Sequence, residues 1–280
     1  MTPSLAAADR ECRRINRRHG VTYYWATQLL GPEQRRHVHA IYALCRRADD
    51  IVDTPGVVDP RRRLAAFEAD LRRSVAGATS DDPALTAVAR TVRVHGLDPS
   101  LFDRFFEAMR ADLDIDHYET WEDLLVYMDG SAAVIGEMLL PILAPTDPTA
   151  ALEPARQLGL AFQLTNFLRD VGEDLDLGRQ YLPRADVRRF GADLEHRAAT
   201  PEFVALMTFE IDRCDGLYEA AATGLPLLPP RSRRCIAAAS RSYRAILREI
   251  ERNGYDVFTR RASVPMSRKL LGVATELVRG

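Results

Sequence analysis

The sequence predicts an all-α protein organised as a single domain. Apolar residues recur at helical spacing along nearly the whole chain, and the alternation typical of strands is almost absent. Prolines such as Pro32 and Pro83 open apolar-periodic segments, as first-turn prolines do. The segments 54–60 and 76–82 are rich in turn-forming residues but too short to link separate domains. We therefore expect one domain over residues 1–280.

Periodicity and capping signals place the helices in order along the chain. The expected helices are residues 5–19, 23–30, 32–53, 60–76, 83–95, 99–114, 120–143, 149–175, 201–222, 229–253 and 264–278. Pro99 marks the start of one of them in the same way as the two prolines above. The pair Asn253 and Gly254 is typical of a C-cap and ends another.

The composition is that of a globular protein without an extended basic surface. The 280 residues are 46% hydrophobic, and the formal net charge is −2. Nucleic acid is therefore not an expected partner. The start of the chain lacks a signal-peptide pattern, and no apolar run approaches the ~18 residues of a membrane span. We expect a cytoplasmic protein, with peripheral contact at the inner face of the membrane as an alternative.

The cysteines do not form a recognisable framework. Cys12, Cys45, Cys214 and Cys235 are scattered, with no CxxC pair among them. Reduced thiols in a cytoplasmic protein are the expected state.

A first group of polar residues shares one stripe of the third expected helix. Tyr42, Arg46, Asp49 and Asp53 are three or four positions apart and so lie on one face. Asp50 lies beside them. The arginine is within one turn of the acids, where it could hold phosphate oxygens.

A second group has the same character near the end of the helix expected over residues 149–175. Gln163, Asn166, Asp170 and Asp174 fall on one face. Arg169 adjoins the first of these acids and provides a second candidate for phosphate binding.

Both acidic groups run against the electrostatics of a helix. The C-terminal end of a helix carries negative partial charge, and neighbouring carboxylates repel one another. A bound divalent cation would compensate, and carboxylate and amide oxygens are ligands that Mg²⁺ prefers. One acidic helix end alone is typical of a solvated surface. Two matched groups predict a shared metal and phosphate site.

The histidines of the third expected helix are not needed for this site. His37 and His39 lie on a stripe that looks exposed, and we interpret them as surface residues.

At these residues the chain resembles the phytoene synthase and squalene synthase family of head-to-head prenyl-diphosphate couplers, and bacterial phytoene synthases most of all. The likeness covers nearly the whole chain. It rests on residues 19–23, 42–53, 127–136, 163–174, 178–183, 254–258 and 260–261. The resemblance implies a helical bundle of the isoprenoid synthase type with a central cavity.

The resemblance also implies a set of magnesium ligands, with Mn²⁺ as an alternative ion. By position these ligands are Asp49, Asp50, Asp53, Asn166, Asp170 and Asp174. The resemblance also implies that catalysis depends on Tyr42 and Arg46 of the first group and on acids of both groups. That set is Tyr42, Arg46, Asp49, Asp53, Asp170 and Asp174.

Further positions match residues that contact the substrates in the family. They are His19, Thr22, Tyr23, Tyr42, Arg46, Tyr127, Gln163, Asn166, Arg169, Tyr181, Tyr243, Arg260 and Arg261. Only one of the last two arginines matches a diphosphate-binding position, and the sequence leaves that choice open. Tyr42 and Tyr243 could equally be core residues. Thr22 replaces a frequent Ser, and Asp129 replaces a frequent Tyr, which puts any role of position 129 in doubt.

The family reaction condenses two allylic diphosphates without a covalent enzyme nucleophile. The implied activity is coupling of two geranylgeranyl diphosphates to phytoene through a cyclopropylcarbinyl diphosphate, with release of diphosphate and no NADPH. One rival is a C15 coupler that makes presqualene diphosphate, squalene or dehydrosqualene. Another is an inactive helical assembly subunit, although the intact acids speak against it. The oligomeric state is not set by the sequence.

Two groups of small residues bear on tail length. Ala26 and Thr27 share a face with Tyr23, and we expect them to leave depth for a C20 tail. Ala132, Ala133 and Gly136 would either make room for a prenyl tail or allow close helix packing.

Overall fold

The computed structural model describes residues 3–54 and 56–264, and its regular elements within them are helical. The only strand-like feature that these residues contain is an isolated bridge between His117 and Gln180. The all-α prediction is confirmed. The expectation of one domain over 1–280 stays a prediction.

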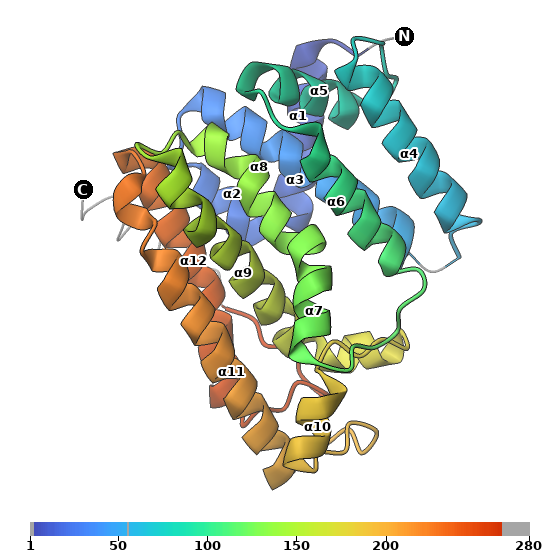
Figure 1. Ribbon diagram of the computed structural model, residues 1–280, viewed down its shortest axis with the longest axis vertical. Coiled ribbons are helices and arrows are strands. Elements are labelled where there is room, and N and C mark those ends of the chain that lie inside the picture. The colour runs from blue at the N-terminus through green and yellow to red at the C-terminus, as the bar shows by residue number, and fades with distance from the viewer. Residues whose placement is uncertain (1–2, 55, 265–280) are drawn as a thin grey trace.

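The described residues of the first half of the chain form six helices. They are α1 (Leu5–His19), α2 (Val21–Thr27), α3 (Pro32–Asp53), α4 (Pro60–Val75), α5 (Pro83–His95) and α6 (Pro99–Ala111). Helix α3 packs against α1, α4, α5 and α8. These helices gather in the half of the molecule that holds the N-terminus (Figure 1).

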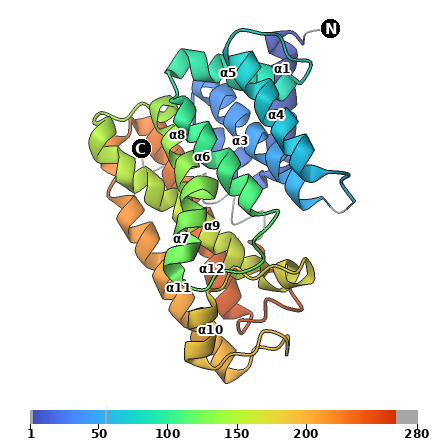
Figure 2. The ribbon, with the colours of Figure 1, turned by 45° about the vertical axis from the view of Figure 1, so that its right-hand side comes forward.

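The second half of the chain is built around one long helix. Its elements are α7 (Trp121–Met128), the π-helical turn η1 (Asp129–Ala133), α8 (Val134–Leu143), α9 (Pro148–Asp176), α10 (Arg184–Phe190), α11 (Pro201–Ala222), the 3₁₀ turn η2 (Leu225–Leu227) and α12 (Pro230–Arg252). Helix α9 contacts α8, α11, α12 and η1. Helix α10 and the start of α11 form the end of the molecule away from the N-terminus (Figures 1 and 2).

Some helix bounds differ by up to three residues from the predicted ones, as in α2, which was expected at 23–30, and α6, which was expected to end at residue 114. Larger differences occur in three places. The segment 120–143 is interrupted by the π-helical turn, a distortion that often marks a functional site. Helix α10 was missed because its seven residues are too few to show a clear apolar period. The helix expected at 264–278 lies outside the described residues, except for Val264 itself.

Two glycines bring the backbone of α9 into contact with the backbones of η1 and α8. A Cβ atom at Gly136 would collide with the carbonyl oxygen of Ala155, and one at Gly159 would collide with that of Ala132. Gly136 therefore serves close helix packing. Gly136 also lines the central cavity, as does Ala132, whereas Ala133 is fully buried in the core. Both expected roles are therefore present.

The expectation that His37 and His39 are surface residues is wrong. Their exposed fractions are 0% and 2%, because α1, α2 and α5 pack over that stripe of α3. The Nδ1 atom of His37 lies 2.9 Å from Thr91 Oγ1, and Nε2 of His39 lies 3.0 Å from Thr27 Oγ1. Burial lowers the pKa of each histidine to about 4, so both are neutral side chains at pH 7.

The expectation about apolar runs also needs correction. The stretch Trp121–Leu143 contains 18 successive residues with a mean hydropathy of 1.4 and is long and apolar enough to cross a membrane by length and composition. Half of these 18 residues are buried inside the protein. Core helices of soluble proteins pass the same criterion, so this is weak support for a membrane span.

Candidate active site

A cavity of about 770 Å³ runs between the helices, and its lining changes character along its length. Along α3 the lining passes from Val38 to Asp53, and along α9 it passes from Leu158 to Asp174. The two helices begin at the same end of the molecule, because the start of each contacts the first turn of α12 or the segment that leads into it. Gln34 Nε2 near the start of α3 donates to Ser232 Oγ at 3.3 Å. The backbone N–H of Thr146, just before α9, donates to the carbonyl of Leu227.

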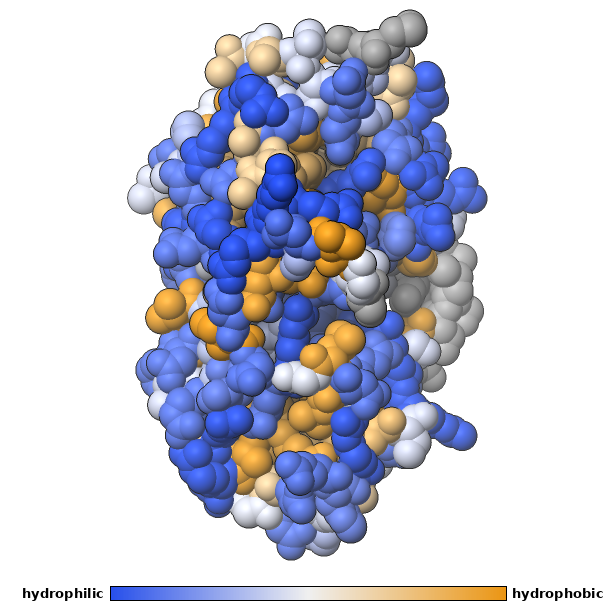
Figure 3. Space-filling view, turned by 90° about the vertical axis from the view of Figure 1, so that its right-hand side faces the viewer, coloured by the Kyte–Doolittle hydropathy of each residue, from blue (hydrophilic) through white to orange (hydrophobic). Residues whose placement is uncertain are grey.

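Both helices also end together, which makes one end of the cavity apolar and the other acidic. Asp53 Oδ1 at the end of α3 accepts a hydrogen bond of 2.6 Å from Arg179, which follows α9. The space-filling view shows a hollow flanked by hydrophobic and hydrophilic side chains (Figure 3). Such a shape suits a ligand with a charged head and a long apolar tail.

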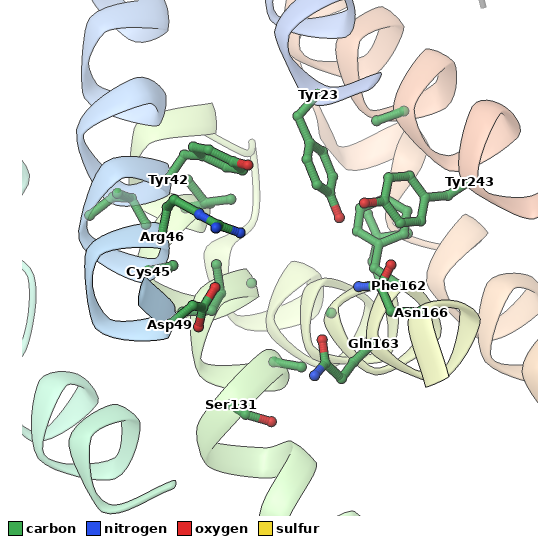
Figure 4. A pocket seen from close by; sticks show the side chains of 18 of the residues that line it. Tyr23, Tyr42, Cys45, Arg46, Asp49, Ser131, Phe162, Gln163, Asn166 and Tyr243 are labelled. Carbon is green, nitrogen blue, oxygen red and sulfur yellow. The ribbon is translucent and has the colours of Figure 1, made fainter. Parts of the chain in front are cut away.

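The first acidic wall is formed by the last turns of α3. Burial, reinforced by the charge of Asp53, raises the pKa of Asp49 to about 8. Arg46 points toward the cavity just above Asp49 (Figure 4). Asp50 is turned aside from the cavity lining and pairs with Arg46 at 2.5 Å.

The second acidic wall is formed by the last turns of α9. Burial raises the pKa of Asp174 to about 8, and the charge of Asp170 adds to the shift. For Asp170 burial acts in the same direction, but Arg169 and Arg261 overcome it and lower the pKa. Arg261 donates to both carboxylate oxygens of Asp170, at 2.9 and 3.0 Å.

Two residues that the sequence reasoning did not assign lie at the acidic end of the cavity. Arg179 follows α9 and pairs through its guanidinium with Asp53 of α3, so it links the ends of the two helices, and it also reaches the backbone oxygen of Asp112 at 3.4 Å. The half-buried carboxyl of Asp112 lines the cavity beyond the end of α6, and burial raises its pKa to about 6. Arg179 lies inside the segment 178–183, whose resemblance to the family was the signal available in the sequence. Asp112 had only its place near a helix end to mark it.

Aromatic rings separate the acidic end from the apolar end. Tyr23 stacks on Tyr243 with 4.8 Å between ring centroids, and Phe162 lies 4.6 Å from Tyr243. Tyr42 is 6.0 Å from Tyr23. These rings come from α2, α3, α9 and α12 and converge on the cavity (Figure 4). Their faces offer negative electrostatic potential to a cation in the cavity.

A profile of the squalene/phytoene synthase family matches residues 16–268. The chain belongs to this family. It is 38% identical to the 15-cis-phytoene synthase of Synechococcus elongatus, with 99% of this chain and 94% of that protein covered. It is 37% identical to the 15-cis-phytoene synthase of a Synechocystis species, with 96% and 84% covered.

Solved structures of the family share the fold. A dehydrosqualene synthase in complex with a ligand has a TM-score of 0.91 and 30% identity, with 98% of this chain and 97% of that chain covered. A squalene synthase from Alicyclobacillus acidocaldarius has a TM-score of 0.81 and 33% identity, with 90% and 96% covered. The predicted isoprenoid synthase type of bundle with a central cavity is confirmed.

The fold brings most of the residues predicted for a family site to one cavity. Those that line it are His19, Tyr23, Tyr42, Arg46, Asp49, Asp53, Tyr127, Gln163, Asn166, Arg169, Asp170, Asp174, Tyr181, Tyr243 and Arg261. Thr22, Asp50 and Arg260 do not line it, so of the two neighbouring arginines Arg261 is the one at the cavity. Ala26 and Thr27 line the cavity as expected.

One further lining residue escaped the sequence reasoning. Asn16 on α1 is fully buried, and both polar atoms of its amide lack a hydrogen-bond partner in the described part of the chain. An isolated Asn on a helix face offered no signal that could have marked it.

The donor set fits a divalent cation that shares its shell with a ligand. Among the described ion pairs, Asp49 and Asp174 have no arginine partner, and their raised pKa values reflect that lack. Within the described ranges, no three His, Cys, Asp or Glu side chains converge closely enough to hold one ion by themselves. Mg²⁺ commonly keeps waters and binds substrate phosphates besides one or two carboxylates, so a cage of this kind suits it.

Proposed function

We propose that this protein couples two molecules of geranylgeranyl diphosphate head to head, giving phytoene through a cyclopropylcarbinyl diphosphate and releasing diphosphate. The observation that carries the proposal is the near full-length likeness, at 37–38% identity, to two proteins named 15-cis-phytoene synthase. The acidic and apolar ends of the cavity support it, since they match the two parts of a prenyl diphosphate.

We further propose that the two acidic walls hold Mg²⁺, with Asp49 and Asp53 on one side and Asn166, Asp170 and Asp174 on the other. When bound, the metal would neutralise the charge that develops on the departing diphosphate. Arg46 and Arg169 would bind diphosphate oxygens. Arg179 and Arg261, which pair with the acids, would be close enough to add to that binding.

The remaining residues act by placing and shielding the reacting carbons. The rings of Tyr23, Tyr42, Phe162 and Tyr243 lie between the charged end and the tail end, where an allylic cation would form. They would stabilise the cation and exclude water from it. Holding both substrates in one cavity supplies the proximity that a reaction between two carbon chains needs.

The test is product analysis after incubation with geranylgeranyl diphosphate and Mg²⁺, with and without NADPH. Phytoene as the product in both incubations supports the proposal. A product that becomes reduced when NADPH is present would place the enzyme with squalene synthases instead.

A C15 coupling activity is the second candidate. The solved structures that share this fold at 30–33% identity are named dehydrosqualene and squalene synthases. A higher kcat/KM for farnesyl diphosphate than for geranylgeranyl diphosphate would establish this candidate and overturn the first.

A further inference from the structure

A carboxyl group and two phenols meet on the cavity wall, on segments other than the helices α3 and α9 that carry the two acidic clusters. Tyr127 Oη of α7 donates to Asp112 Oδ2 at 2.7 Å. Tyr181 Oη donates to Asp112 Oδ1 at 3.4 Å. All three side chains line the cavity, and they come from three separate segments of the chain.

The rings of both tyrosines are held by stacking. Tyr181 lies flat on Phe167, with centroids 3.9 Å apart and an interplanar angle of 9°. Tyr127 lies 5.9 Å from Tyr181 and 6.3 Å from Phe167. Both tyrosine side chains are at least 91% buried, so neither ring has room to turn its hydroxyl elsewhere.

This carboxyl is satisfied differently from the other carboxyls of the cavity. No Lys, Arg or His forms an ion pair with its oxygens among the described residues, and Arg179 reaches only its backbone carbonyl. Its bonding partners are the two phenol hydrogens. Because those hydrogens are committed to Asp112, the lone pairs are what each phenol oxygen still offers to a ligand.

We propose that Asp112 is a positioning residue that makes Tyr127 the proton acceptor of the coupling reaction. The proposal rests on the proposed function, because it needs a cation that loses a proton inside this cavity. Tyr127 would touch the reacting carbons, whereas Asp112 acts through Tyr127. Tyr181 donates to the second oxygen of Asp112 and so keeps the carboxyl oriented toward Tyr127.

The step balances without any other reactant. A C–H bond breaks on the carbon that is to be joined to the cationic carbon, and its electron pair forms the closing bond of the three-membered ring or, where the two carbons are already neighbours, the second bond of a double bond. The released proton goes to a lone pair of Tyr127 Oη. The original phenol hydrogen moves along the existing hydrogen bond to Asp112 Oδ2, so the tyrosine ends neutral and the carboxyl ends protonated.

The variants Asp112→Asn, Tyr127→Phe and the double variant test this pairing. Tyr118→Phe is the matched control, since Tyr118 lies in the same stack, 5.3 Å from Tyr127, but does not line the cavity or bond to Asp112. Each variant is assayed with geranylgeranyl diphosphate and with the same substrate carrying deuterium at C1. Thermal melting of each variant is recorded alongside.

The expected result is a fall in kcat of about 100-fold for Asp112→Asn and for Tyr127→Phe, as for loss of a general base. KM should be unchanged, and a deuterium isotope effect larger than that of the wild type should appear, because proton loss becomes rate-limiting. The double variant should be no slower than either single variant, since the two residues act as a unit. Tyr118→Phe should behave as the wild type.

Several outcomes would overturn the proposal. A higher Mg²⁺ requirement in Asp112→Asn would make Asp112 a metal ligand, and a raised KM with unchanged kcat would make it a substrate contact only. Losses that multiply in the double variant would show that the two residues act separately. If Asp112→Asn melts well below the wild type, its rate does not report on the reaction, and Tyr127→Phe provides the test. An isotope effect in Tyr127→Phe no larger than that of the wild type would then overturn the proposal.

The outcome for the proposed function is read separately. A wild type that couples neither C20 nor C15 diphosphate overturns the proposed function and this proposal with it. A wild type that couples either substrate, with Asp112→Asn indifferent in rate and isotope effect, overturns only the role of Asp112.

Discussion

Two regions of this protein gather acids and arginines, and they resolve the charge in different ways. Beside the cavity, Arg104 and Arg156 each bond to both Asp129 and Glu137, joining α6, η1, α8 and α9. At the acidic end of the cavity, Asp49 and Asp174 have no such partner among the described ion pairs.

The pKa values of the carboxyls follow this difference. Although burial opposes it, bonding to Arg104 and Arg156 lowers the pKa of Asp129. The pKa of Asp49 and that of Asp174 are each raised to about 8. We infer that the paired network serves the fold, which accounts for the Asp at position 129, whereas the unpaired acids await a cation.

Of the changes considered, removal of the metal should lower turnover the most. If it does not, the unpaired acids do not differ from the paired ones in the way inferred above. EDTA should abolish turnover and Mg²⁺ should restore it, because without the metal nothing at these acids would neutralise the charge that develops on the departing diphosphate. Radiolabelled substrate with extracted hydrocarbon product is a suitable assay. Full activity after exhaustive chelation would contradict the assignment of these acids to a metal.

Substituting one unpaired acid should give the next largest effect. Asp49→Asn or Asp174→Asn should lower turnover by a factor of about 10²–10³, as for loss of one main electrostatic stabiliser. The melting temperature should hold or rise, because a half-buried carboxyl without an ion-pair partner among the described residues is replaced by a neutral amide of the same shape. Near-wild-type turnover at saturating substrate and Mg²⁺ would show that the two walls do not form one site.

The paired network should behave in the opposite way. Glu137→Gln should lower the free energy of unfolding by about 2 kcal/mol, because the side chain is only 12% exposed and two arginines lose a charged partner. Turnover at a temperature where the variant is folded should stay near that of the wild type. Chemical denaturation gives the first quantity and the coupling assay the second. A large loss of turnover without loss of stability would place Glu137 in the site.

The pH dependence of stability should carry the signature of Asp129. Its pKa is lowered in the folded protein, so its stabilising contribution is present above its unfolded pKa and is lost as pH falls through the folded value. Denaturation of the wild type and of Asp129→Asn can be compared from pH 7 down to pH 3. The wild type should lose its advantage over the variant below about pH 4, the ordinary pKa of Asp. A gap that stays constant with pH would mean that the charge of Asp129 is not what stabilises the network.

The preference for a C20 over a C15 substrate should depend on neither charged region. A change in the apolar cavity lining should therefore give the smallest effect on turnover. Ala26→Phe fills part of the cavity lining and should shift the ratio of kcat/KM for C20 over C15 substrate by about tenfold toward C15, or about 1.4 kcal/mol. Thr27→Phe is a less clean variant, because Thr27 Oγ1 also bonds to His39. An unchanged ratio in Ala26→Phe would contradict a tail path along α2.

The local pattern of the sequence was enough to predict the bounds of the two helices that carry the acidic residues of the site. Periodicity and first-turn prolines predicted α3 in full and α9 to within one residue at each end. The stripes on those helices predicted which of their acids face inward, because side chains three or four positions apart share a face regardless of their surroundings. Asp50 was placed in the site by resemblance alone, and it turns aside to Arg46.

Only the tertiary structure decided what depends on contacts between distant segments. Burial of His37 and His39 follows from helices packed over α3, and the role of Gly136 follows from the carbonyl of a residue in another helix. Arg179 links the ends of α3 and α9 across the fold, and Asp112 meets Tyr127 and Tyr181 only because three segments converge. A helical period determines the face on which a side chain lies. The partner that meets this face is set by packing, which the order of residues within one helix does not contain.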